Sequence, residues 1–239
     1  MRQSKPDVIV LAGGLGTRLQ DAVPGVPKCM ATLAGKPFLE YLLNYLQNNR
    51  LQRVILSLGY LADVVKEHFG DRYGTLALEY SIEDEPLGTG GAVKRALPLA
   101  ATESVFVLNG DTFFDVDLPE MLHQHNLSKA LVTIALHEAQ NAGRYGVVAI
   151  NSDGRITSFS EKQPGVGRGL INGGIYLVEK DYLSEHPLTG TFSLEKDLFQ
   201  QECHSTMIYG YHSNGYFIDI GIPDDYRRAC EEIPELMRL

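Results

Sequence analysis

Short apolar runs alternate with amphipathic stretches along the first half of the chain. Residues 7–11 form an apolar run rich in β-branched side chains, which is typical of a buried strand. Between residues 38 and 47, leucines recur on one face of a helix. This alternation continues to residue 125 and predicts a parallel sheet. The expected strands are 7–11, 53–58, 76–81 and 104–108, and the expected helices are 38–47, 61–69, 91–97 and 118–125.

The pattern changes from Ala130 onward. Strand-like runs then lie close together, so part of the pairing in this half is expected to be antiparallel. Pro223 suits the first position of a helix and predicts a terminal helix from Asp224, which Pro234 should end or kink. No linker or repeat divides the chain, so residues 1–239 are expected to form one domain with a mixed sheet. The expected strands of this half are 131–136, 146–150, 156–160 and 171–178.

A glycine-rich segment, Leu-Ala-Gly-Gly-Leu-Gly-Thr-Arg-Leu, begins at Leu11, where the first strand ends. Glycine has no Cβ, so backbone N–H groups there can approach an anion. Arg18 and Lys28 add positive charge beside this loop. Convergent N–H groups, a guanidinium and an ammonium together favour a polyphosphate ligand. A glycine-rich turn between a strand and a helix, without any ligand, is the alternative.

Two better-known glycine loops do not fit this segment. A Walker A loop continues with Gly-Lys-Ser/Thr, but here Thr17-Arg18 follows the last glycine. A dinucleotide-binding fingerprint has a third glycine at the position of Leu19. It also has an acidic residue after the second strand, where this chain has Ser-Leu-Gly at 57–59. The loop is therefore assigned to neither class.

The composition restricts which ligands the protein is expected to bind and in which cellular compartment it is expected to lie. The chain has 239 residues, 44% of them hydrophobic, which is enough for a full core. A net charge of -9 and a pI near 5.2 argue against a basic track for nucleic acid. The N-terminus lacks the apolar core of a signal peptide, and no later run approaches a membrane span. Cys29, Cys203 and Cys230 show no zinc-binding spacing. A cytoplasmic protein that binds neither nucleic acid nor membrane is expected; its sequence does not reveal whether it forms a homo-oligomer.

Two aspartates stand at positions suited to a metal ion. Asp111 closely follows the apolar strand 104–108, and open α/β sheets bind ligands at the carboxyl ends of their strands. Asp219 has apolar neighbours that would bury its charge unless that charge were used. Because Mg²⁺ takes one or two carboxylates together with substrate phosphate oxygens, the pair is expected to meet over the glycine loop as a magnesium site. Alternatively, Asp111 caps the next segment and Asp219 belongs to a turn.

Two further segments suggest contacts to a base and a sugar. Residues 83–92 contain a proline and three glycines, too many for a regular element, and predict a loop whose bare backbone suits a flat nucleobase. Glu83 would accept two hydrogen bonds from guanine, although the N3–H of uracil or thymine would also fit. Lys162 would hold a second phosphate and Asn172 a sugar hydroxyl. The alternatives are an acidic surface loop and, at Glu161-Lys162, a solvated ion pair.

These signals in this order resemble the sugar-nucleotidyltransferase family, and the match covers nearly the whole chain. Cys29 departs from the family's pattern, because proline often follows the lysine there; a buried thiol is the interpretation we prefer. Further segments, at 35–42, 80–86, 110–116 and 144–147, are most similar to the branch that transfers a guanylyl group to a heptose 1-phosphate. The family motifs are 11–19, Pro27-Lys28, 85–91, Asn109-Gly110-Asp111, Glu161-Lys162, Asn172-Gly173-Gly174 and Asp219-Ile220-Gly221.

The resemblance implies an α/β fold of the nucleotide-diphospho-sugar transferase type, a Rossmann-like three-layer α/β/α arrangement with a mixed, mainly parallel central sheet. Residues 1–112 would bind the nucleotide and residues 113–239 the sugar phosphate. The implied reaction is Mg²⁺-dependent transfer of GMP from GTP to a heptose 1-phosphate, with release of pyrophosphate, for the synthesis of cell-surface glycans. Mannose 1-phosphate, or uridylyl or thymidylyl transfer, is the nearest alternative.

The resemblance also implies roles for individual residues. Arg18, Lys28 and Lys162 would be catalytic, and Asp111 and Asp219 would bind the metal. The nucleotide would contact Leu11, Ala12, Gly13, Gly14, Gly16, Thr17, Glu83, Gly88, Thr89, Asn109 and Asp111. The sugar phosphate would contact Gly146, Glu161, Lys162, Asn172 and Gly173.

Two rival functions belong to other classes. Asp115-Val116-Asp117 is an Asp-x-Asp sequence, which a metal-dependent glycosyltransferase would use to hold a sugar nucleotide. Such an enzyme would not need the Gly-Thr-Arg loop with Lys28, which suits a departing pyrophosphate. A non-catalytic sensor of sugar nucleotides could lose its metal ligands, whereas this chain keeps both Asp111 and Asp219.

Overall fold

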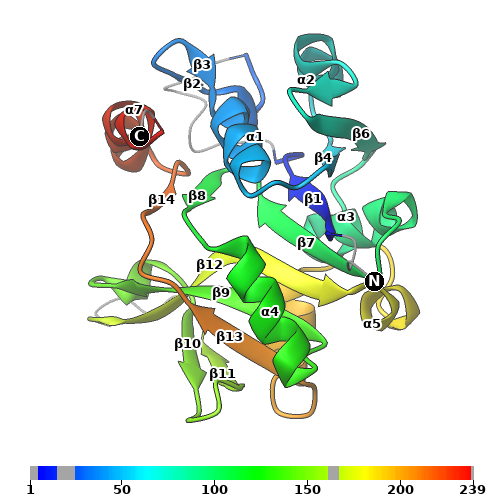
Figure 1. Ribbon diagram of the computed structural model, residues 1–239, viewed down its shortest axis with the longest axis vertical. Helices are drawn as coiled ribbons and strands as arrows, with labels where there is room; N and C mark the ends of the chain where they lie inside the picture. The colour runs from blue at the N-terminus through cyan, green and yellow to red at the C-terminus, as the bar shows by residue number, and fades with distance from the viewer. Residues whose placement is uncertain (1–4, 15–24, 161–166, 238–239) are drawn as a thin grey trace.

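A computed structural model describes residues 5–14, 25–160 and 167–237 of the chain. Its main sheet has ten strands, eight of them in the order β11-β10-β12-β7-β1-β4-β6-β5, with β9 paired to β12 and β13 (Figure 1). The strand order is not the sequence order, because helical crossovers return the chain to strands on either side of β1. The expected α/β fold with a mixed central sheet is confirmed.

The first half of the chain supplies the parallel part of the sheet. Strand β1 pairs in parallel with both β4 and β7, and β4 pairs in parallel with β6. The strands are β1 (Asp7–Leu11), β4 (Arg53–Leu58), β6 (Leu76–Ile82) and β7 (Ser104–Asn109). The helices are α1 (Phe38–Asn48), α2 (Ala62–Phe69), α3 (Gly88–Ala96) and α4 (Leu118–Ser128). Every expected element of this half is present.

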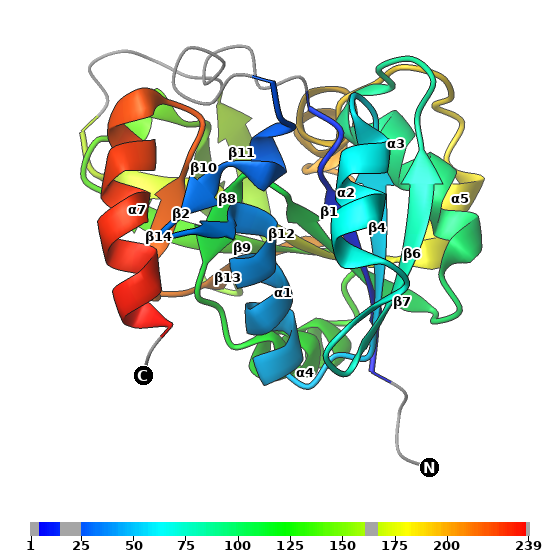
Figure 2. The same cartoon turned by 90° about the horizontal axis from the view of Figure 1, so that it is seen from above.

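The parallel strands are buried on both faces. In β1, Val8 and Val10 belong to the hydrophobic cluster that includes residues of α1, α2 and α7, whereas Ile9 belongs to the cluster that includes Val93 of α3. This alternation follows from the two-residue repeat of a strand. Helices α7, α1 and α2 follow one another along one face in both views, and α5 lies at the far side from α7 (Figures 1 and 2). The result is the expected three-layer arrangement.

The second half supplies most of the antiparallel part. Strand β12 (Gly169–Glu179) is antiparallel to β7, to β9 (Val132–Ala139) and to β10 (Val147–Ile150). Strand β10 is antiparallel to β11 (Ile156–Ser160), but β9 runs parallel to β13 (Ile208–His212). The predicted antiparallel pairing is therefore confirmed. Strand β12 joins the two halves because it pairs with β7 of the first half and with β9 and β10 of the second.

Shorter elements complete the fold. A separate pair of strands, β8 (Thr112–Phe114) and β14 (Phe217–Asp219), lies next to α7 (Figure 1). The remaining strands are β2 (Thr32–Leu33), β3 (Lys36–Pro37) and β5 (Arg72–Tyr73). The remaining helices are α5 (Lys180–Glu185), α6 (Gln200–Glu202) and α7 (Pro223–Leu236). The 3₁₀ turns are η1 (Lys28–Met30), η2 (Leu97–Leu99) and η3 (Ala142–Arg144), and η4 (Leu194–Phe199) is a π-helical turn.

Two helix boundaries differ from expectation. Helix α7 begins at Pro223, as expected, but continues two residues past Pro234 to Leu236. Pro234 is buried in the core with Ile233, so packing holds the last turn in place although proline has no N–H to donate. Helix α3 begins at Gly88 rather than at residue 91. Its glycine-rich start is part of the functional site. Within the described part of the chain, no helix is both long and apolar enough to cross a lipid bilayer.

Candidate active site

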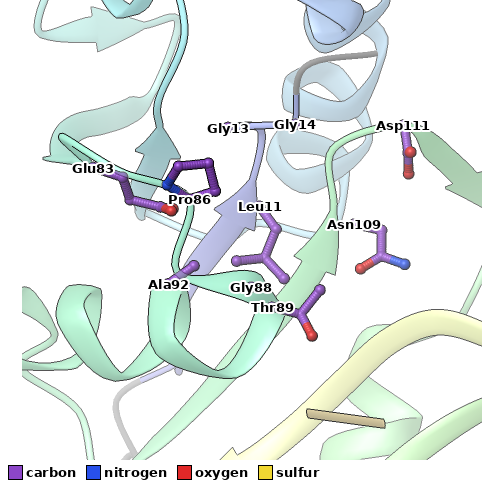
Figure 3. A pocket seen from close by; sticks show the side chains of 10 residues that line it. All are labelled: Leu11, Gly13, Gly14, Glu83, Pro86, Gly88, Thr89, Ala92, Asn109 and Asp111. Carbon is purple, nitrogen blue, oxygen red and sulfur yellow. The ribbon is translucent and has the colours of Figure 1, made fainter. Parts of the chain in front are cut away.

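A cavity of about 460 Å³ opens where β1 and β7 end, beside the start of α3. Leu11 ends β1, Asn109 ends β7, and Asp111 follows on the next loop (Figure 3). Most residues predicted to bind nucleotide lie in its wall, which consists of Leu11, Gly13, Gly14, Glu83, Pro86, Gly88, Thr89, Ala92, Asn109 and Asp111. We call this cavity the donor pocket. Three of the other predicted residues, Gly16, Thr17 and Arg18, lie outside the described residues.

Close backbone contacts fix the floor of the donor pocket. A Cβ on Gly110 would lie 2.6 Å from the carbonyl oxygen of Leu11, and a Cβ on Gly13 would lie 3.0 Å from the nitrogen of Gly59. A side chain at Gly110 would require the backbone to shift, and one at Gly13 would be unusually crowded, so both positions suit glycine. The N–H of Gly110 donates to the carbonyl oxygen of Leu11, at 2.9 Å, and that of Ala12 donates to Ser57, at 2.8 Å. Ala12 is therefore buried beneath the pocket rather than in its wall.

Glu83 has structural partners as well as a place in the wall. Its Oε1 accepts a hydrogen bond from the Ser57 hydroxyl at 3.0 Å, and its Oε2 accepts one from the Leu87 N–H at 3.1 Å. These bonds fix the turn that carries Pro86 into the pocket wall. A carboxylate oxygen accepts more than one hydrogen bond, so Glu83 retains capacity for a ligand.

The prediction that residues 83–92 form a loop is wrong for their second half. Gly88–Gly91 form the first turn of α3, which packs tightly against residues 190–192. A Cβ on Gly90 would lie 2.1 Å from the Phe192 ring, and one on Gly91 would lie 2.3 Å from the carbonyl oxygen of Gly190. The glycines thus serve helix packing, which outweighs their low helix propensity.

Asp111 and Asp219 meet beside the donor pocket; Asp111 belongs to its wall, whereas Asp219 lines an adjoining cavity. Thr112, next to Asp111, pairs with Asp219 across the β8–β14 ladder. Lys28 Nζ lies 2.5 Å from Asp111 Oδ2 and 3.8 Å from Asp219 Oδ1. The Lys28 side chain is only 14% exposed, whereas those of Asp111 and Asp219 are 38% and 36% exposed. The tertiary structure thus brings the two predicted metal ligands and one predicted catalytic lysine together.

The electrostatic environment of this pair favours a cation. Burial raises the pKa of the Asp219 carboxyl, and the negative charge of Asp111 raises it further. Lys28, and a hydrogen bond that Asp219 Oδ1 accepts from the Gly221 N–H at 2.7 Å, act in the opposite direction. The described residues contain no group of three His, Cys, Asp or Glu side chains arranged around one metal position. A cation bound here would take two carboxylates and need its other ligands from a substrate, as Mg²⁺ commonly does.

Cys29 is a buried thiol, as the sequence indicated. It is 1% exposed on turn η1, and its Sγ lies 3.9 Å from the carbonyl oxygen of Ala12 beneath the glycine loop. Burial raises the pKa of the Cys29 thiol to about 12. At neutral pH this group is protonated and is no nucleophile.

A second cavity, of about 360 Å³, contains two of the predicted sugar-binding residues, Gly146 and Asn172. Its wall consists of Tyr145, Gly146, Phe159, Ser160, Asn172, Ser193, Glu195, Lys196 and Gln200. We call it the acceptor pocket. Gly173 is not part of this wall, because it packs against Phe114; a Cβ there would lie 2.5 Å from that ring. Glu161 and Lys162 lie outside the described residues.

Sequence reasoning missed Glu195 and Tyr176. The Glu195 carboxylate lies in the acceptor pocket and accepts hydrogen bonds from Tyr176, Thr89 and Ser193. No motif marked it, since it stands in an ordinary amphipathic stretch. Tyr176 belongs to the expected strand 171–178, but its apolar neighbours gave no reason to expect a polar partner.

The Asp-x-Asp sequence has a structural role instead. Asp117 is the N-cap of α4, where its Oδ1 accepts a hydrogen bond from the Glu120 N–H at 2.9 Å. Helix capping thus accounts for Asp117, one of the two aspartates of the feature that favoured a glycosyltransferase.

A donor pocket at the carboxyl edge of a parallel sheet, with paired carboxylates beside it, defines an α/β nucleotide-binding protein. The family model described as "Nucleotidyl transferase" matches residues 7–235. The chain belongs to this nucleotidyl transferase family, as the sequence motifs indicated. Members of the family generally use a divalent metal ion.

Three relatives indicate the branch of the family to which the chain is similar. The chain is 44% identical to a D-glycero-alpha-D-manno-heptose 1-phosphate guanylyltransferase of Aneurinibacillus thermoaerophilus, over 95% of this chain and 98% of that one. It is 42% identical to the enzyme of the same name from Campylobacter jejuni, over 91% and 96%. The crystal structure of HddC from Yersinia pseudotuberculosis complexed with GMP-PN superposes with a TM-score of 0.85, at 37% identity over 95% of this chain and 99% of that one.

Proposed function

We propose that this enzyme transfers GMP from GTP to D-glycero-α-D-manno-heptose 1-phosphate and releases pyrophosphate. The observation that carries the proposal is the meeting of Lys28, Asp111 and Asp219 beside the donor pocket. The two relatives named as heptose 1-phosphate guanylyltransferases, each aligned over more than nine-tenths of this chain, support the choice of both substrates. The product, GDP-heptose, would serve as the heptosyl donor for a cell-surface glycan, and we propose a cytoplasmic location.

The proposed reaction is a direct in-line displacement. A phosphate oxygen of the sugar 1-phosphate forms a bond to the α-phosphorus of GTP while the bond from that phosphorus to the bridging oxygen breaks. The electron pair of the broken bond leaves with pyrophosphate. No enzyme nucleophile is required, and the protonated, buried Cys29 offers none. Catalysis then rests on positioning and on stabilising the developing charge.

Magnesium is the metal we propose, held by Asp111 and Asp219. The carboxylate pair fits it, because two carboxylates face a single ammonium, and a bound cation would relieve the repulsion between Asp111 and Asp219 that raises the Asp219 pKa. When bound, Mg²⁺ would neutralise charge on the triphosphate. Lys28, which already contacts both carboxylates, would then bind a phosphate oxygen. Arg18 and the backbone of 13–17 remain the proposed ligands of the departing pyrophosphate, and Lys162 that of the acceptor phosphate.

The donor pocket is proposed to bind the guanine and ribose. Glu83 would accept the N1–H and the exocyclic amine of guanine with the lone pairs that Ser57 and Leu87 leave free. Leu11, Gly88 and Thr89 would contact the nucleoside, and Asn109 the ribose or a phosphate. Each of these side chains or backbone groups faces one cavity, which supports a single bound nucleotide.

The acceptor pocket is proposed to bind the sugar through Gly146 and Asn172, with Glu161 from the adjoining segment. Gly173 would act through the backbone course of β12 rather than as a wall residue. The donor pocket consists of residues from 11 to 111 and the acceptor pocket of residues from 145 to 200, which supports the division into a nucleotide half, 1–112, and a sugar-phosphate half, 113–239.

Pyrophosphate release tests the proposal directly. The purified chain is assayed with Mg²⁺ across GTP, ATP, UTP, CTP and dTTP, each against heptose, mannose and glucose 1-phosphates, with EDTA as the metal-free control. We expect release with GTP and the heptose phosphate. Release confined to another pair would replace the substrates and keep the reaction. A blank grid with tight binding of a sugar nucleotide would overturn the proposed activity.

A further inference from the structure

One carboxylate connects the two pockets. Glu195 lies on the π-helical turn η4 and belongs to the wall of the acceptor pocket. Its Oε2 accepts hydrogen bonds from Thr89 Oγ1 and Ser193 Oγ, both at 2.8 Å. Its Oε1 accepts one from the Tyr176 hydroxyl, also at 2.8 Å. Thr89 belongs to the donor pocket, so this carboxylate bonds directly to a residue of the opposite pocket.

All three hydroxyls must donate to Glu195. Each also accepts an N–H: Thr89 from Leu194 N at 2.9 Å, Ser193 from Lys196 N at 3.2 Å, and Tyr176 from Asn172 Nδ2 at 2.9 Å. An ionised carboxylate only accepts hydrogen bonds, so each hydroxyl directs its one proton to Glu195 while a lone pair accepts the N–H. Glu195 therefore accepts at both of its polar atoms. An ionised carboxylate does so, whereas a primary amide does not.

The same chain of bonds sets the orientation of Asn172. Its Oδ1 accepts the Gly174 N–H at 2.9 Å, so its Nδ2 is the atom that faces Tyr176. Protons are thus donated in one direction, from Asn172 to Tyr176 and from Tyr176 to Glu195. Tyr176 is fully buried, so water does not offer its hydroxyl an alternative acceptor. Asn172 belongs to the wall of the acceptor pocket, where the oriented amide keeps one N–H for a ligand.

We propose that Glu195 is a positioning residue for the acceptor sugar phosphate, which it controls through Tyr176 by fixing the amide of Asn172. This inference rests on the proposed function, because it concerns the acceptor of that reaction. The hydrogen bond between Glu195 and Thr89 holds the first turn of α3 against η4, so that the two pockets keep a fixed separation. Thr89 retains its bond from Leu194 when Glu195 changes, and the nucleotide is therefore less affected than the sugar phosphate.

The Glu195→Gln variant is the primary test. It keeps the size of the side chain but places an NH₂ group against at least one hydroxyl that donates to Glu195 in the wild type. We expect the KM for the sugar 1-phosphate to rise about tenfold or more, the fold-change of losing roughly one well-made buried hydrogen bond. The fold-change in the KM for GTP should be less than about a third of the fold-change in the KM for the sugar 1-phosphate. An equal rise in both values would contradict a role specific to the acceptor.

Glu202→Gln is the matched control. Glu202 also accepts a tyrosine hydroxyl, that of Tyr182 at 2.6 Å, and it belongs to neither pocket. Thermal unfolding is measured for both variants, and a loss of stability is expected in each. Only Glu195→Gln should raise the KM for the acceptor. If Glu202→Gln raises it equally, Glu195 contributes only to stability and the proposal is wrong.

A double-mutant cycle tests the path through Tyr176. Tyr176→Phe removes the hydroxyl that links Glu195 to Asn172, so adding Glu195→Gln to it should raise the acceptor KM little further. Independent, multiplying effects would overturn the proposed path. If Glu195→Gln does not fold, Tyr176→Phe decides alone: an unchanged acceptor KM in that variant rejects the proposal.

Failure of the proposed function can be told apart from failure of this inference. The wild-type chain is first run on the full grid of nucleotides and sugar phosphates. If another pair is the active one, the proposed substrates are wrong, and Glu195 is then tested on the active acceptor. If no pair is active, the proposed function and the role of Glu195 are both rejected.

Discussion

The donor and acceptor pockets use different physical means to hold a ligand. The donor pocket combines bare backbone, at Gly13 and Gly14, with the charge of Asp111, which is paired with Lys28 beside Asp219. The described part of the acceptor pocket is ordered by hydrogen bonds from the Tyr176 and Ser193 hydroxyls to the Glu195 carboxylate, and by one from the Asn172 amide to the Tyr176 hydroxyl. We therefore expect charge interactions to affect mainly the rate at the donor pocket. At the acceptor pocket, the geometry of the hydrogen bonds should affect mainly the affinity for the ligand.

This difference predicts which kinetic parameter a mutation in each pocket should change. Charged groups near a transferred phosphoryl group act most strongly as charge develops, so their loss reduces the rate. Oriented neutral groups bind the ground state and the transition state alike, so their loss raises KM more than it lowers kcat. Mutations on the two sides should therefore separate in these two parameters.

The largest effect is expected from the charges of the donor side. Lys28→Ala should lower the rate by about two to three orders of magnitude, or about 3–4 kcal/mol, because it removes one charge contact. Asp111→Asn should lower the rate comparably and also raise the Mg²⁺ concentration needed for half-maximal activity. Pyrophosphate release across a Mg²⁺ titration measures both. Near-normal turnover in Lys28→Ala would remove that lysine from the mechanism, and an unchanged titration would exclude Asp111 as a ligand.

A smaller effect, mainly on KM, is expected on the acceptor side. Asn172→Asp replaces the amide N–H that Tyr176 accepts with an oxygen that has no proton to donate. The KM for the sugar 1-phosphate should rise by about tenfold to a hundredfold, while the KM for GTP stays within about threefold. Initial rates over both substrates measure the separation.

Asn151→Asp is the control for that change. Asn151 Oδ1 only accepts, from the N–H groups of Asp153 and Arg155 at 3.0 and 2.9 Å, so aspartate preserves its role. Its kinetics should match the wild type. If Asn172→Asp lowers kcat and leaves KM unchanged, the contrast drawn between the pockets fails.

Substitutions of two glycines, one at the start of α3 and one in the wall of the donor pocket, should differ in their effect on stability. Gly90→Ala places a Cβ 2.1 Å from the buried Phe192 ring and should lower the free energy of unfolding by about 1–3 kcal/mol. Gly14→Ala meets no described atom within 4 Å and should leave stability nearly unchanged. Denaturant unfolding of the ligand-free variants measures this difference. Equal loss in both variants would falsify the packing role assigned to the start of α3.

The smallest effect is expected when Asp219 loses its charge in the absence of metal. Folding raises the pKa of this carboxyl, so its ionised form opposes folding at neutral pH. Asp219→Asn should therefore raise the Tm slightly in EDTA. Mg²⁺ with GTP should stabilise the wild type more than the variant, because the variant lacks one proposed ligand. A lower Tm of the variant in EDTA would show that Asp219 has a structural role instead.

The fold was predictable because its signals are local. The apolar runs of β1, β4 and β7 appear directly in the sequence, and so does the helical repeat of α1. The start of α3 was not predictable, since Gly90 and Gly91 join the helix only through contact with 190–192. Helix α7 likewise continues past Pro234 because tertiary packing outweighs the lost hydrogen bond.

The candidate site was predictable only in part for the same reason. The glycine loop and Asp111 stand in recognisable order at the ends of strands, so their position at one edge of the sheet follows from parallel pairing. Glu195 is recognisable only from its partners, which come from α3 and β12 as well as its own turn. A single acidic residue in an amphipathic stretch carries no signal of that kind.

The sequence by itself determined the hydrophobic repeats of the strands and helices, the glycines at the end of β1 and which charged residues are present. These are properties of neighbouring residues, governed by sterics and by hydrophobic repeat. Only the tertiary structure decided that Asp219 pairs with Thr112, next to Asp111, in the β8–β14 ladder and that Lys28 contacts both carboxylates. It also decided that Glu195 accepts hydrogen bonds from Thr89 of the donor pocket and from Ser193 of the acceptor pocket. A hydrogen bond needs its two partners within about 3 Å and an ion pair within about 4 Å, and only the packing of distant segments sets those separations.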